Sequence, residues 1–355
     1  MEQLNLSESP NTIEETPADG ETTTGDGDGF GKFVVALYCM ISLLGITGNL
    51  LVAIVLLRVP SLRSNTSDFL VHLSIVDFMV CVLVIPFFLA PKPNPTPNPG
   101  FFGEVWCRLY KSKFLFWFFT MTSVLGLTAV NLERYVAIVY PHKYKTVFSK
   151  QNKYAVIAVC WMLGAITKLE LVILSEEDEV IGCHRDGWSS GGAQAVFGLY
   201  TFTVSFFAPF IVMILAQVKV ISKLNRQVKM LTARTATSGL NPSDQREMWQ
   251  LRASQTLVKT LLACVITFGV CWTPSHIWFL LFNFSVPLAP GRPFHLLTII
   301  LAVGNSCVNP VIYTMTNKPF RKGIRELFCK QRDSNQVTNG TVATGTVSET
   351  ISTAQ

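Results

Sequence analysis

Five polar side chains lie inside long apolar stretches of the 355-residue chain, where a charge or an amide needs a partner. They are Asp77, Asn49, Ser123, Asn305 and Asn309. A charge near the middle of a bilayer costs at least about 2.5 to 3.5 kcal/mol, so Asp77 needs a physical reason to be there. Carboxylate, amide and hydroxyl oxygens are the ligands that small hard cations prefer. The pattern predicts either a hydrated cation site, suited to sodium, or a hydrogen-bonded packing network without an ion.

The side chains that most often carry covalent or metal chemistry show no catalytic spacing. His72, His276 and His295 are scattered along the chain, so no metal-ligand set or catalytic cluster emerges. Arg134 directly follows Glu133 where an apolar stretch ends, and a guanidinium there can extend into the headgroup region. We therefore predict that the protein is not an enzyme and that it needs no cofactor apart from the cation.

The elements that must position these residues are long apolar helices. Charged residues make up only 15% of the chain, whereas a soluble domain carries about 25%. Only helices and closed barrels satisfy the backbone in hydrocarbon, and the apolar runs lack the alternation of barrel strands. We predict an all-α membrane protein, a bundle of seven transmembrane helices. A helix needs about 20 apolar residues to cross the bilayer, and seven stretches are long enough. They are Phe33–Leu57, Asp68–Ala90, Glu104–Val139, Tyr154–Leu174, Ala193–Leu224, Leu251–Phe284 and Phe294–Thr316.

The charges along the chain predict how the bundle is inserted. The first 31 residues hold eight acids and no Lys or Arg, and Glu176–Glu179 follows the fourth stretch. Lys and Arg instead gather in the connections after the first, third and fifth stretches and after the seventh. By the positive-inside rule the N-terminus is extracellular and the C-terminus is cytoplasmic. The net charge of +6 is then a topology signal, and we predict no binding of nucleic acid.

Three parts are predicted along the chain: a disordered extracellular segment at 1–31, a membrane domain at 32–329 and a disordered cytoplasmic tail at 330–355. Asn5 begins a glycosylation sequon on the extracellular side. Prolines at every second position of 91–99 exclude a helix there and predict a stiff outer loop.

The stretch from Lys318 to Cys329 follows the seventh helix and has an apolar and a basic face. This pattern predicts a short amphipathic helix that lies on membrane lipid, with Cys329 as a palmitoylation site at its end. The apolar face consists of Phe320, Ile324, Leu327 and Phe328.

Short motifs in every apolar stretch together resemble one family, the rhodopsin-like (class A) G-protein-coupled receptors. The resemblance covers Phe33 to Cys329, and the order of the motifs makes coincidence negligible. The motifs are Gly48-Asn49, Leu73 to Asp77, Glu133-Arg134-Tyr135 with Pro141, Trp161, Pro209, Phe268, Cys271-Trp272-Thr273-Pro274, and Asn309-Pro310-Val311-Ile312-Tyr313.

The resemblance implies a plasma-membrane receptor with a population-shift mechanism. A ligand that binds one of two bundle states more tightly favours that state, in which the sixth helix moves outward and a heterotrimeric G protein binds. The residues implied in coupling and activation are Glu133, Arg134, Tyr135, Pro141, Gln217, Asn309, Pro310 and Tyr313. The implied packing switch consists of Val124, Pro209, Phe268, Trp272 and Pro274, although Phe268 and Trp272 also suit ordinary core packing.

The resemblance implies two further features. One is a disulfide between Cys107 and Cys183, which the oxidising extracellular side would allow. The other is binding of receptor kinases and arrestin to the tail, which is rich in Ser and Thr. A tail that is solvated and unmodified fits the composition equally well.

Three departures from the family pattern affect what it implies. Gln217 stands where the family usually has a tyrosine that steadies the active arginine. Ser254 stands where many members carry an acid that locks Arg134. The 26 residues between Cys107 and Arg134 exceed the usual spacing, which leaves the register of the outer third helix open.

The ligand class follows first from exclusions. No acid lies between Cys107 and Glu133, so the counter-ion of amine receptors is missing. No Lys lies in the seventh helix, which excludes a retinal Schiff base. Pro86 and Trp106-Cys107, with the acidic Glu176–Glu179 segment, resemble neuropeptide receptors of the somatostatin, opioid, galanin and allatostatin kind.

We therefore predict an extracellular peptide ligand, which an acidic surface would steer if the peptide is basic. A merely solvated acidic loop, a receptor for a lipid or another small non-amine ligand, and a transporter are the alternatives. A transporter would show internal repeats, and none is visible in the sequence. The residues predicted to line the ligand pocket are Phe116, Thr120, Trp272, His276, Phe279 and His295.

Overall fold

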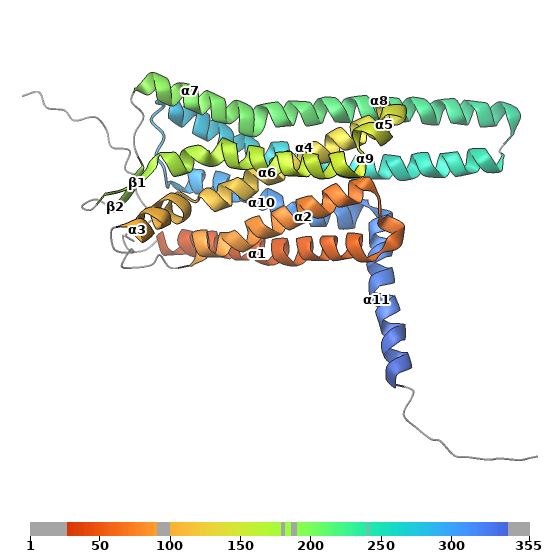
Figure 1. The fold of residues 1–355 in the computed structure, drawn as a ribbon, viewed down its shortest axis with the longest axis horizontal. Coiled ribbons are helices and arrows are strands. Elements are labelled where there is room, and N and C mark those ends of the chain that lie inside the picture. The colour runs from red at the N-terminus through yellow and green to blue at the C-terminus, as the bar shows by residue number, and fades with distance from the viewer. Residues whose placement is uncertain (1–26, 91–99, 179–181, 186–189, 240, 340–355) are drawn as a thin grey trace, which may run out of the picture.

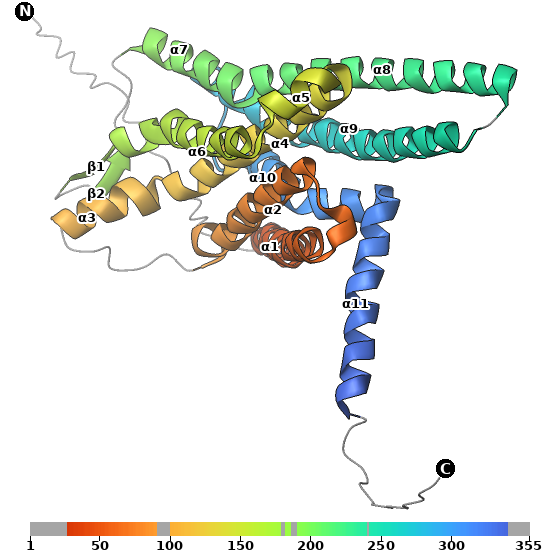
Figure 2. The ribbon, with the colours of Figure 1, turned by 45° about the vertical axis from the view of Figure 1, so that its right-hand side comes forward.

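The computed structural model describes residues 27–90, 100–178, 182–185, 190–239 and 241–339. Figures 1 and 2 show long helices that lie side by side in one elongated bundle, with α11 crossing one end of it. The described α-helices are α1 (Gly27–Arg58), α2 (Asn65–Val84), α3 (Phe101–Val105), α4 (Phe114–Val139), α5 (Pro141–Val147), α6 (Lys150–Ile173), α7 (Gly191–Phe202), α8 (Ala208–Ser238), α9 (Pro242–Asn283), α10 (Pro293–Thr316) and α11 (Lys318–Asn339). Between them lie the 3₁₀ turn η1 (Pro60–Leu62), the π-helical turns η2 (Ile85–Leu89), η3 (Trp106–Lys111) and η4 (Thr203–Phe207), and the strands β1 (Ser175–Asp178) and β2 (Gly182–Arg185).

The seven predicted spans are confirmed. In the part of the chain that the structure describes, seven helices are long and apolar enough to cross a membrane. They are Gly29–Arg58, Asn65–Leu89, Phe101–Val139, Lys150–Ile173, Gly191–Thr237, Pro242–Asn283 and Pro293–Thr316.

The fifth and sixth helices are longer than their apolar stretches. The sequence predicts ends at Leu224 and Leu251, but α8 continues to Ser238 and α9 already begins at Pro242. Residues 225–238 contain no Gly or Pro, and many of them are good helix formers, so nothing stops α8 before Gly239 at φ 77°. The predicted connection is therefore a helical hairpin, which an ion pair between Arg234 and Asp244 holds together.

The outer third span contains the extra residues that left its register open. Its backbone forms α3 and the π-helical turn η3, breaks at Lys113 with φ 56°, and resumes as α4. A π-helical turn takes up more residues than an α-helical turn, so the extra length is absorbed without shifting α4. Cys107 lies within η3 as a result.

The predicted disulfide is confirmed. Cys107 is bonded to Cys183 of strand β2, with a Cα–Cα distance of 5.4 Å. Strands β1 and β2 pair antiparallel, so the acidic segment that was predicted as a loop begins as a hairpin. Arg108 links η3 to both α6 and the hairpin, because its guanidinium donates to the Val172 carbonyl of α6 at 2.7 Å and lies 3.8 Å from the Glu176 carboxylate of β1. We call the end of the bundle that carries this hairpin and the disulfide the disulfide end, and we call the opposite end the Arg134 end.

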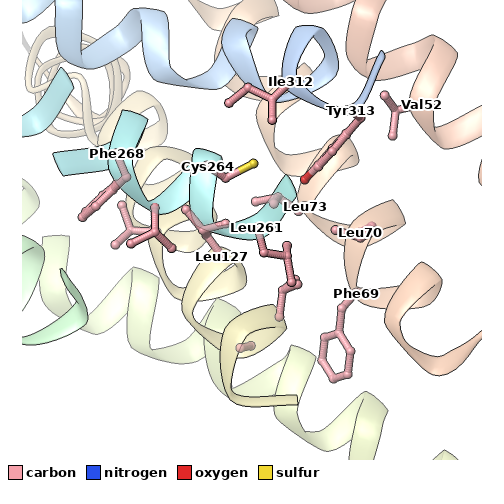
Figure 3. Packing of buried hydrophobic residues seen from close by; sticks show 14 of the residues in the cluster. Val52, Phe69, Leu70, Leu73, Leu127, Leu261, Cys264, Phe268, Ile312 and Tyr313 are labelled. Atoms are coloured by element: carbon pink, nitrogen blue, oxygen red, sulfur yellow. The ribbon is translucent and has the colours of Figure 1, made fainter. Parts of the chain in front are cut away.

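The core follows the whole length of the bundle, and its centre is shown in Figure 3. Leu127 of α4, Leu261 and Phe268 of α9, and Tyr313 of α10 are among its buried side chains. Lipid is as apolar as these side chains, so close packing rather than exclusion of water holds the helices together. Gly48 permits such packing of α1 on α10, because a Cβ there would lie 2.9 Å from the Pro310 Cβ.

Helix α11 agrees with the predicted amphipathic helix at its start and differs at its end. Its first turn is capped by Asn317, whose Oδ1 accepts from the Phe320 backbone N–H at 3.1 Å. Phe320 is buried in the core, whereas Phe328 is exposed. The helix runs to Asn339, ten residues past the predicted end at Cys329, because residues 330–339 contain no Gly or Pro.

Three predicted features fall outside the described part of the chain. These are the glycosylation site at Asn5, the proline-rich segment at 91–99 and the tail after residue 339, and the side chain of Cys329 is also outside it. Helix α1 begins at Gly27, inside the segment 1–31 that was predicted as disordered.

Candidate functional site

The first candidate site is a polar cluster around Asp77 in the middle of the bundle. Asp77 is fully buried. Ser123 donates from Oγ to Asp77 Oδ1 at 2.6 Å, and Asn309 donates from Nδ2 to Asp77 Oδ2 at 2.9 Å. The carboxylate therefore joins α2, α4 and α10, three spans that are far apart in the sequence.

Two further asparagines belong to the same region but do not donate to the carboxylate. Asn49 ties α1 to α10, because its Nδ2 donates to the carbonyls of Gly45 and Ser306, each at 2.9 Å. Asn305 is buried one helical turn before Asn309. The side-chain oxygens of Asn49, Asn305 and Asn309 are buried and accept no hydrogen bond from the described residues. Buried amide oxygens are usually paired, so this region has spare acceptor capacity.

The second candidate site is the pair Glu133–Arg134 at the Arg134 end. Glu133 is fully buried and its two oxygens accept four hydrogen bonds. Arg134 donates from Nε and from one terminal nitrogen, both at 2.6 Å. Thr66 Oγ1 of α2 donates at 3.0 Å, and the hydroxyl of Tyr144 donates as well. Charge-assisted bonds of this kind are about twice as strong as neutral ones.

Helix α5 brings Tyr144 to Glu133. Pro141 opens this helix, where its missing N–H costs nothing and its fixed φ favours the first turn. Tyr144 then lies one turn later. Burial and the hydrogen bond to Glu133 raise the pKa of Tyr144 to about 12, so the hydroxyl keeps its proton at neutral pH. Tyr135 packs its ring on Tyr140 instead, with ring centroids 5.7 Å apart.

Gln217 lies in a buried amide pair rather than beside Arg134. Its Nε2 donates to Asn131 Oδ1 at 2.6 Å, and Asn131 Nδ2 donates to the Leu127 carbonyl at 2.8 Å. The pair joins α8 to α4. The family resemblance would connect Gln217 to Arg134. In the structure, however, Arg134 forms its ion pair with Glu133.

The residues of the predicted packing switch lie together in the core. Val124 and Phe268 are buried in one cluster, and the Phe268 ring lies 6.0 Å from Trp272. Pro209 follows the π-helical turn η4, and Pro274 lies inside α9, where a proline removes a backbone hydrogen bond and favours a kink.

The residues of the predicted ligand pocket are divided among several contacts near the disulfide end. The His276 ring stacks on Phe206 at 5.1 Å and lies tilted against Trp272, with the ring centroids 5.2 Å apart. Phe116 is buried against Phe88, 5.1 Å away. Thr120 donates from Oγ1 to the Phe116 carbonyl at 2.7 Å. The ring centroids of Phe279 and Phe197 are 6.3 Å apart, and the His295 ring stacks on Trp278 with centroids 3.7 Å apart.

Comparison with known proteins identifies the family. The sequence pattern of the 7 transmembrane receptor (rhodopsin family) matches residues 48–313. The chain belongs to this family. It is therefore a receptor and not an enzyme, and as a seven-span member of the family it is a plasma-membrane protein.

Three curated receptors illustrate the similarity. Galanin receptor type 2 of Rattus norvegicus is 28% identical over 86% of this chain and 80% of its own length. The octopamine receptor beta-2R of Chilo suppressalis is 25% identical over 86% of this chain and 83% of its own length. The cholecystokinin receptor of Xenopus laevis is 29% identical over 83% of this chain and 76% of its own length.

Sequence reasoning missed several residues of these sites. Asn131 is a polar residue inside an apolar stretch, as Asn49 is, so the search for polar side chains in such stretches would have found it. Thr66, Tyr144 and Phe206 carry no such signal, because hydroxyls and aromatic rings are common near helix ends and in cores. Lys168 is buried on α6 with its Nζ 3.2 Å from Ser205 Oγ, and a charge inside an apolar stretch is the signal that could have found it.

The hydroxyl of Tyr144 gives a first prediction for this receptor. Tyr144→Phe keeps the ring but removes one donor to Glu133, so the carboxylate holds Arg134 in a less ordered arrangement. We expect ligand-independent signalling to rise about fivefold, because loss of one hydrogen bond costs roughly 1 kcal/mol and changes the ratio of active to resting receptor by that factor. A G-protein dissociation assay at equal surface expression measures it. Because the pKa of Tyr144 is about 12, the difference should be constant between pH 6 and pH 8, and a difference that varies there would contradict the assignment.

Proposed function

We propose that this receptor binds an extracellular peptide and in response activates heterotrimeric G proteins. The observation that carries the proposal is the ion pair at the Arg134 end between the buried Glu133 and Arg134, whose side chain is 18% exposed. While the Glu133 carboxylate accepts its four hydrogen bonds, the Arg134 guanidinium is not available to a partner protein. Release of Arg134 from Glu133 would let the guanidinium contact that partner. The family resemblance attaches that role to Arg134.

The absence of an acid between Cys107 and Glu133 supports a peptide rather than an amine. The octopamine receptor is named for a cationic amine, but this chain has no Asp or Glu between Cys107 and Glu133 to pair with one. The galanin and cholecystokinin receptors are named for peptides. A lipid or another small non-amine ligand is the second candidate, and the screen below separates the two.

The charge distribution and the disulfide support an orientation with the disulfide end outside. Disulfides form in oxidising compartments, and Glu176 lies at that end beside the disulfide-bonded hairpin. The peptide would then enter at the disulfide end, toward the cluster of Trp272, His276 and Phe206. The N-terminus is extracellular and the C-terminus cytoplasmic in this orientation.

The proposed mechanism is outward movement of the sixth span, α9, at the Arg134 end. Ligand contact near Trp272 acts on Phe268 one turn below, and Pro274 supplies a weak point in the helix. A ligand shifts the two states only by its difference in affinity for them. Tyr313 and Gln217, each buried with a polar atom that has no partner among the described residues, are available for new hydrogen bonds in the active state.

The modifications and further partners are extensions of the same proposal. We propose an N-linked glycan on Asn5, a palmitoyl group on Cys329 next to membrane lipid, and receptor kinases and arrestin on the tail. Mass spectrometry of the purified receptor tests the glycan, the palmitoyl group and the phosphates that the kinases would add to the tail, and absence of each mass shift removes the corresponding assignment.

The test of the proposed function is a G-protein dissociation screen in cells that express the receptor. All G-protein classes are assayed against a neuropeptide library and a lipid library, with Arg134→Ala at matched surface expression as control. A saturable peptide response that Arg134→Ala loses supports the proposal and names the ligand. A response to lipids alone would replace the peptide, and a response that Arg134→Ala retains would overturn the role of Arg134.

We further propose sodium as the ion of the Asp77 cluster. The donor set fits a hard cation, because Asn309, which donates to the Asp77 carboxylate, has an amide oxygen without a partner among the described residues, as Asn305 has one turn earlier on α10. Asp77 and Ser123 would hold the ion between α2 and α4, and Asn49 would position α1 against α10. When bound, the ion supplies one positive charge that balances the buried carboxylate.

Sodium binding predicts a stabilisation that depends on Asp77. At a sodium concentration tenfold above the dissociation constant, the folded receptor gains about 1.4 kcal/mol by mass action. The melting midpoint in detergent should therefore be higher in sodium chloride than in N-methylglucamine chloride of equal ionic strength. Asp77→Asn should remove this difference. An equal difference in the variant would favour a packing network without an ion.

A further inference from the structure

A hydroxyl pair joins the sixth and seventh spans at the Arg134 end. Thr260 Oγ1 of α9 lies 2.8 Å from Thr316 Oγ1 of α10. Thr260 is fully buried, and Thr316 is the last residue of α10. Neither residue belongs to a motif that the sequence pattern assigned to activation.

Each hydroxyl also has a carbonyl of its own helix within reach. Thr260 Oγ1 is 3.0 Å from the Thr256 carbonyl, and Thr316 Oγ1 is 2.7 Å from the Ile312 carbonyl. Each hydroxyl has one proton and two acceptor lone pairs, so one can donate across the interface while the other donates to its own backbone. The bond between the helices can therefore form with either threonine as the donor.

The pair lies beside the core contact that a moving sixth helix must break. Leu261 follows Thr260 directly, and Tyr313 lies one turn before Thr316. Both side chains are buried in the core cluster, and Figure 3 shows them with Cys264 between α9 and α10. Outward movement of α9 at this end would take Thr260 away from Thr316 and open the same interface.

Among the described residues, no ion pair links α9 to Arg134. Ser254 stands where an acid would be needed to reach Arg134, and Arg134 is engaged by Glu133. The ion pair of Asp244 with Arg234 joins α9 to α8 near the start of α9, and closer to Thr260 the two helices meet in an apolar cluster of Val258, Val220 and Leu224. Apolar contacts do not fix one helix position as a hydrogen bond does, because they are not directional.

We infer that Thr260 and Thr316 form the polar clasp that holds the sixth span in the resting state of this receptor. The inference rests on the proposed function, because it assumes that α9 moves during activation. A single neutral hydrogen bond gives a weak clasp, and Thr260 keeps its backbone acceptor when the clasp opens. Loss of the clasp shifts the ratio of active to resting receptor about fivefold.

The test compares four forms at equal surface expression: Thr260→Val, Thr316→Val, the double variant and Thr260→Ser. Valine keeps the shape of threonine without the hydroxyl, whereas serine keeps the hydroxyl. We expect ligand-independent G-protein dissociation to rise about fivefold in either valine form and no further in the double variant, because both remove one bond. Thr260→Ser should remain at the level of the unmodified receptor.

A distance measurement keeps the test independent of the G protein. Spin labels at Lys143→Cys on α5 and Arg252→Cys on α9, both exposed, report the position of α9 in purified receptor without ligand. The population with the longer distance should grow in Thr260→Val and not in Thr260→Ser. Unchanged distances, or a double variant that multiplies the single effects, would overturn the clasp. Changed distances without any G-protein response would leave the clasp supported and contradict the proposed function.

Discussion

Glu133→Gln is expected to give a receptor that signals strongly without ligand. In the structure the Glu133 carboxylate holds Arg134 by two bonds of 2.6 Å inside a buried site. Glutamine keeps the size of the side chain but removes the charge, and one of its two terminal atoms donates instead of accepting. The loss is about 2 kcal/mol for a charge-assisted hydrogen bond, which corresponds to roughly 30-fold in the ratio of active to resting receptor.

The measurement is ligand-independent G-protein dissociation per receptor at the cell surface. Glu326→Gln is a matched control, because it removes the same charge from an exposed residue of α11. The rise should exceed that of Tyr144→Phe, since Tyr144 supplies only one of the four donors to Glu133. Basal signalling that is unchanged in Glu133→Gln would mean that Arg134 is not restrained by this carboxylate.

Removal of the disulfide is expected to have the largest effect on stability. Cys107 and Cys183 are 76 residues apart, and closing a loop of that length contributes about 4.5 kcal/mol in the chain-entropy account. The disulfide also keeps the β1–β2 hairpin beside Arg108, whose guanidinium lies 3.8 Å from the Glu176 carboxylate of β1 and braces the hairpin. The double variant Cys107→Ser/Cys183→Ser should therefore lose both the tether and the brace.

Thermal unfolding in detergent measures this change, with a midpoint lower by roughly 10 °C for a chain of this size. Cys39→Ser is the control, because Cys39 is a free, exposed cysteine of α1 and its replacement should leave the midpoint unchanged. Ligand binding should fall more than the amount of folded receptor, since the hairpin covers the proposed entrance. A midpoint within 2 °C of the unmodified receptor would contradict the chain-entropy account.

The positions of the spans could be predicted because hydrophobicity is a property of each residue alone. The seven stretches needed no knowledge of their neighbours, and α10 begins and ends within one residue of its prediction. The same reasoning failed where polar residues continue a helix. Residues 225–238 are not apolar enough to count as a span, yet their propensities carry α8 to Ser238.

The Asp77 cluster could be predicted in membership but not in contacts. A buried carboxylate needs partners, and polar residues in other apolar stretches are the natural candidates. Which of them would reach it depends on how each helix is rotated. Ser123 and Asn309 donate to the Asp77 carboxylate. Asn49 instead donates to the backbone carbonyls of Gly45 and Ser306.

The sequence by itself determined the family, the seven spans, the polar residues around Asp77, the adjacent Glu133 and Arg134, and the two cysteines of the disulfide. Only the tertiary structure decided that Gln217 pairs with Asn131, that Tyr144 and Thr66 complete the shell of Glu133, that Thr260 meets Thr316, and that η3 absorbs the extra residues before α4. The reason is physical. A residue's preference for lipid or water is local, but its hydrogen-bond partner is set by the rotation and register of two packed helices, which all the side chains between them fix together.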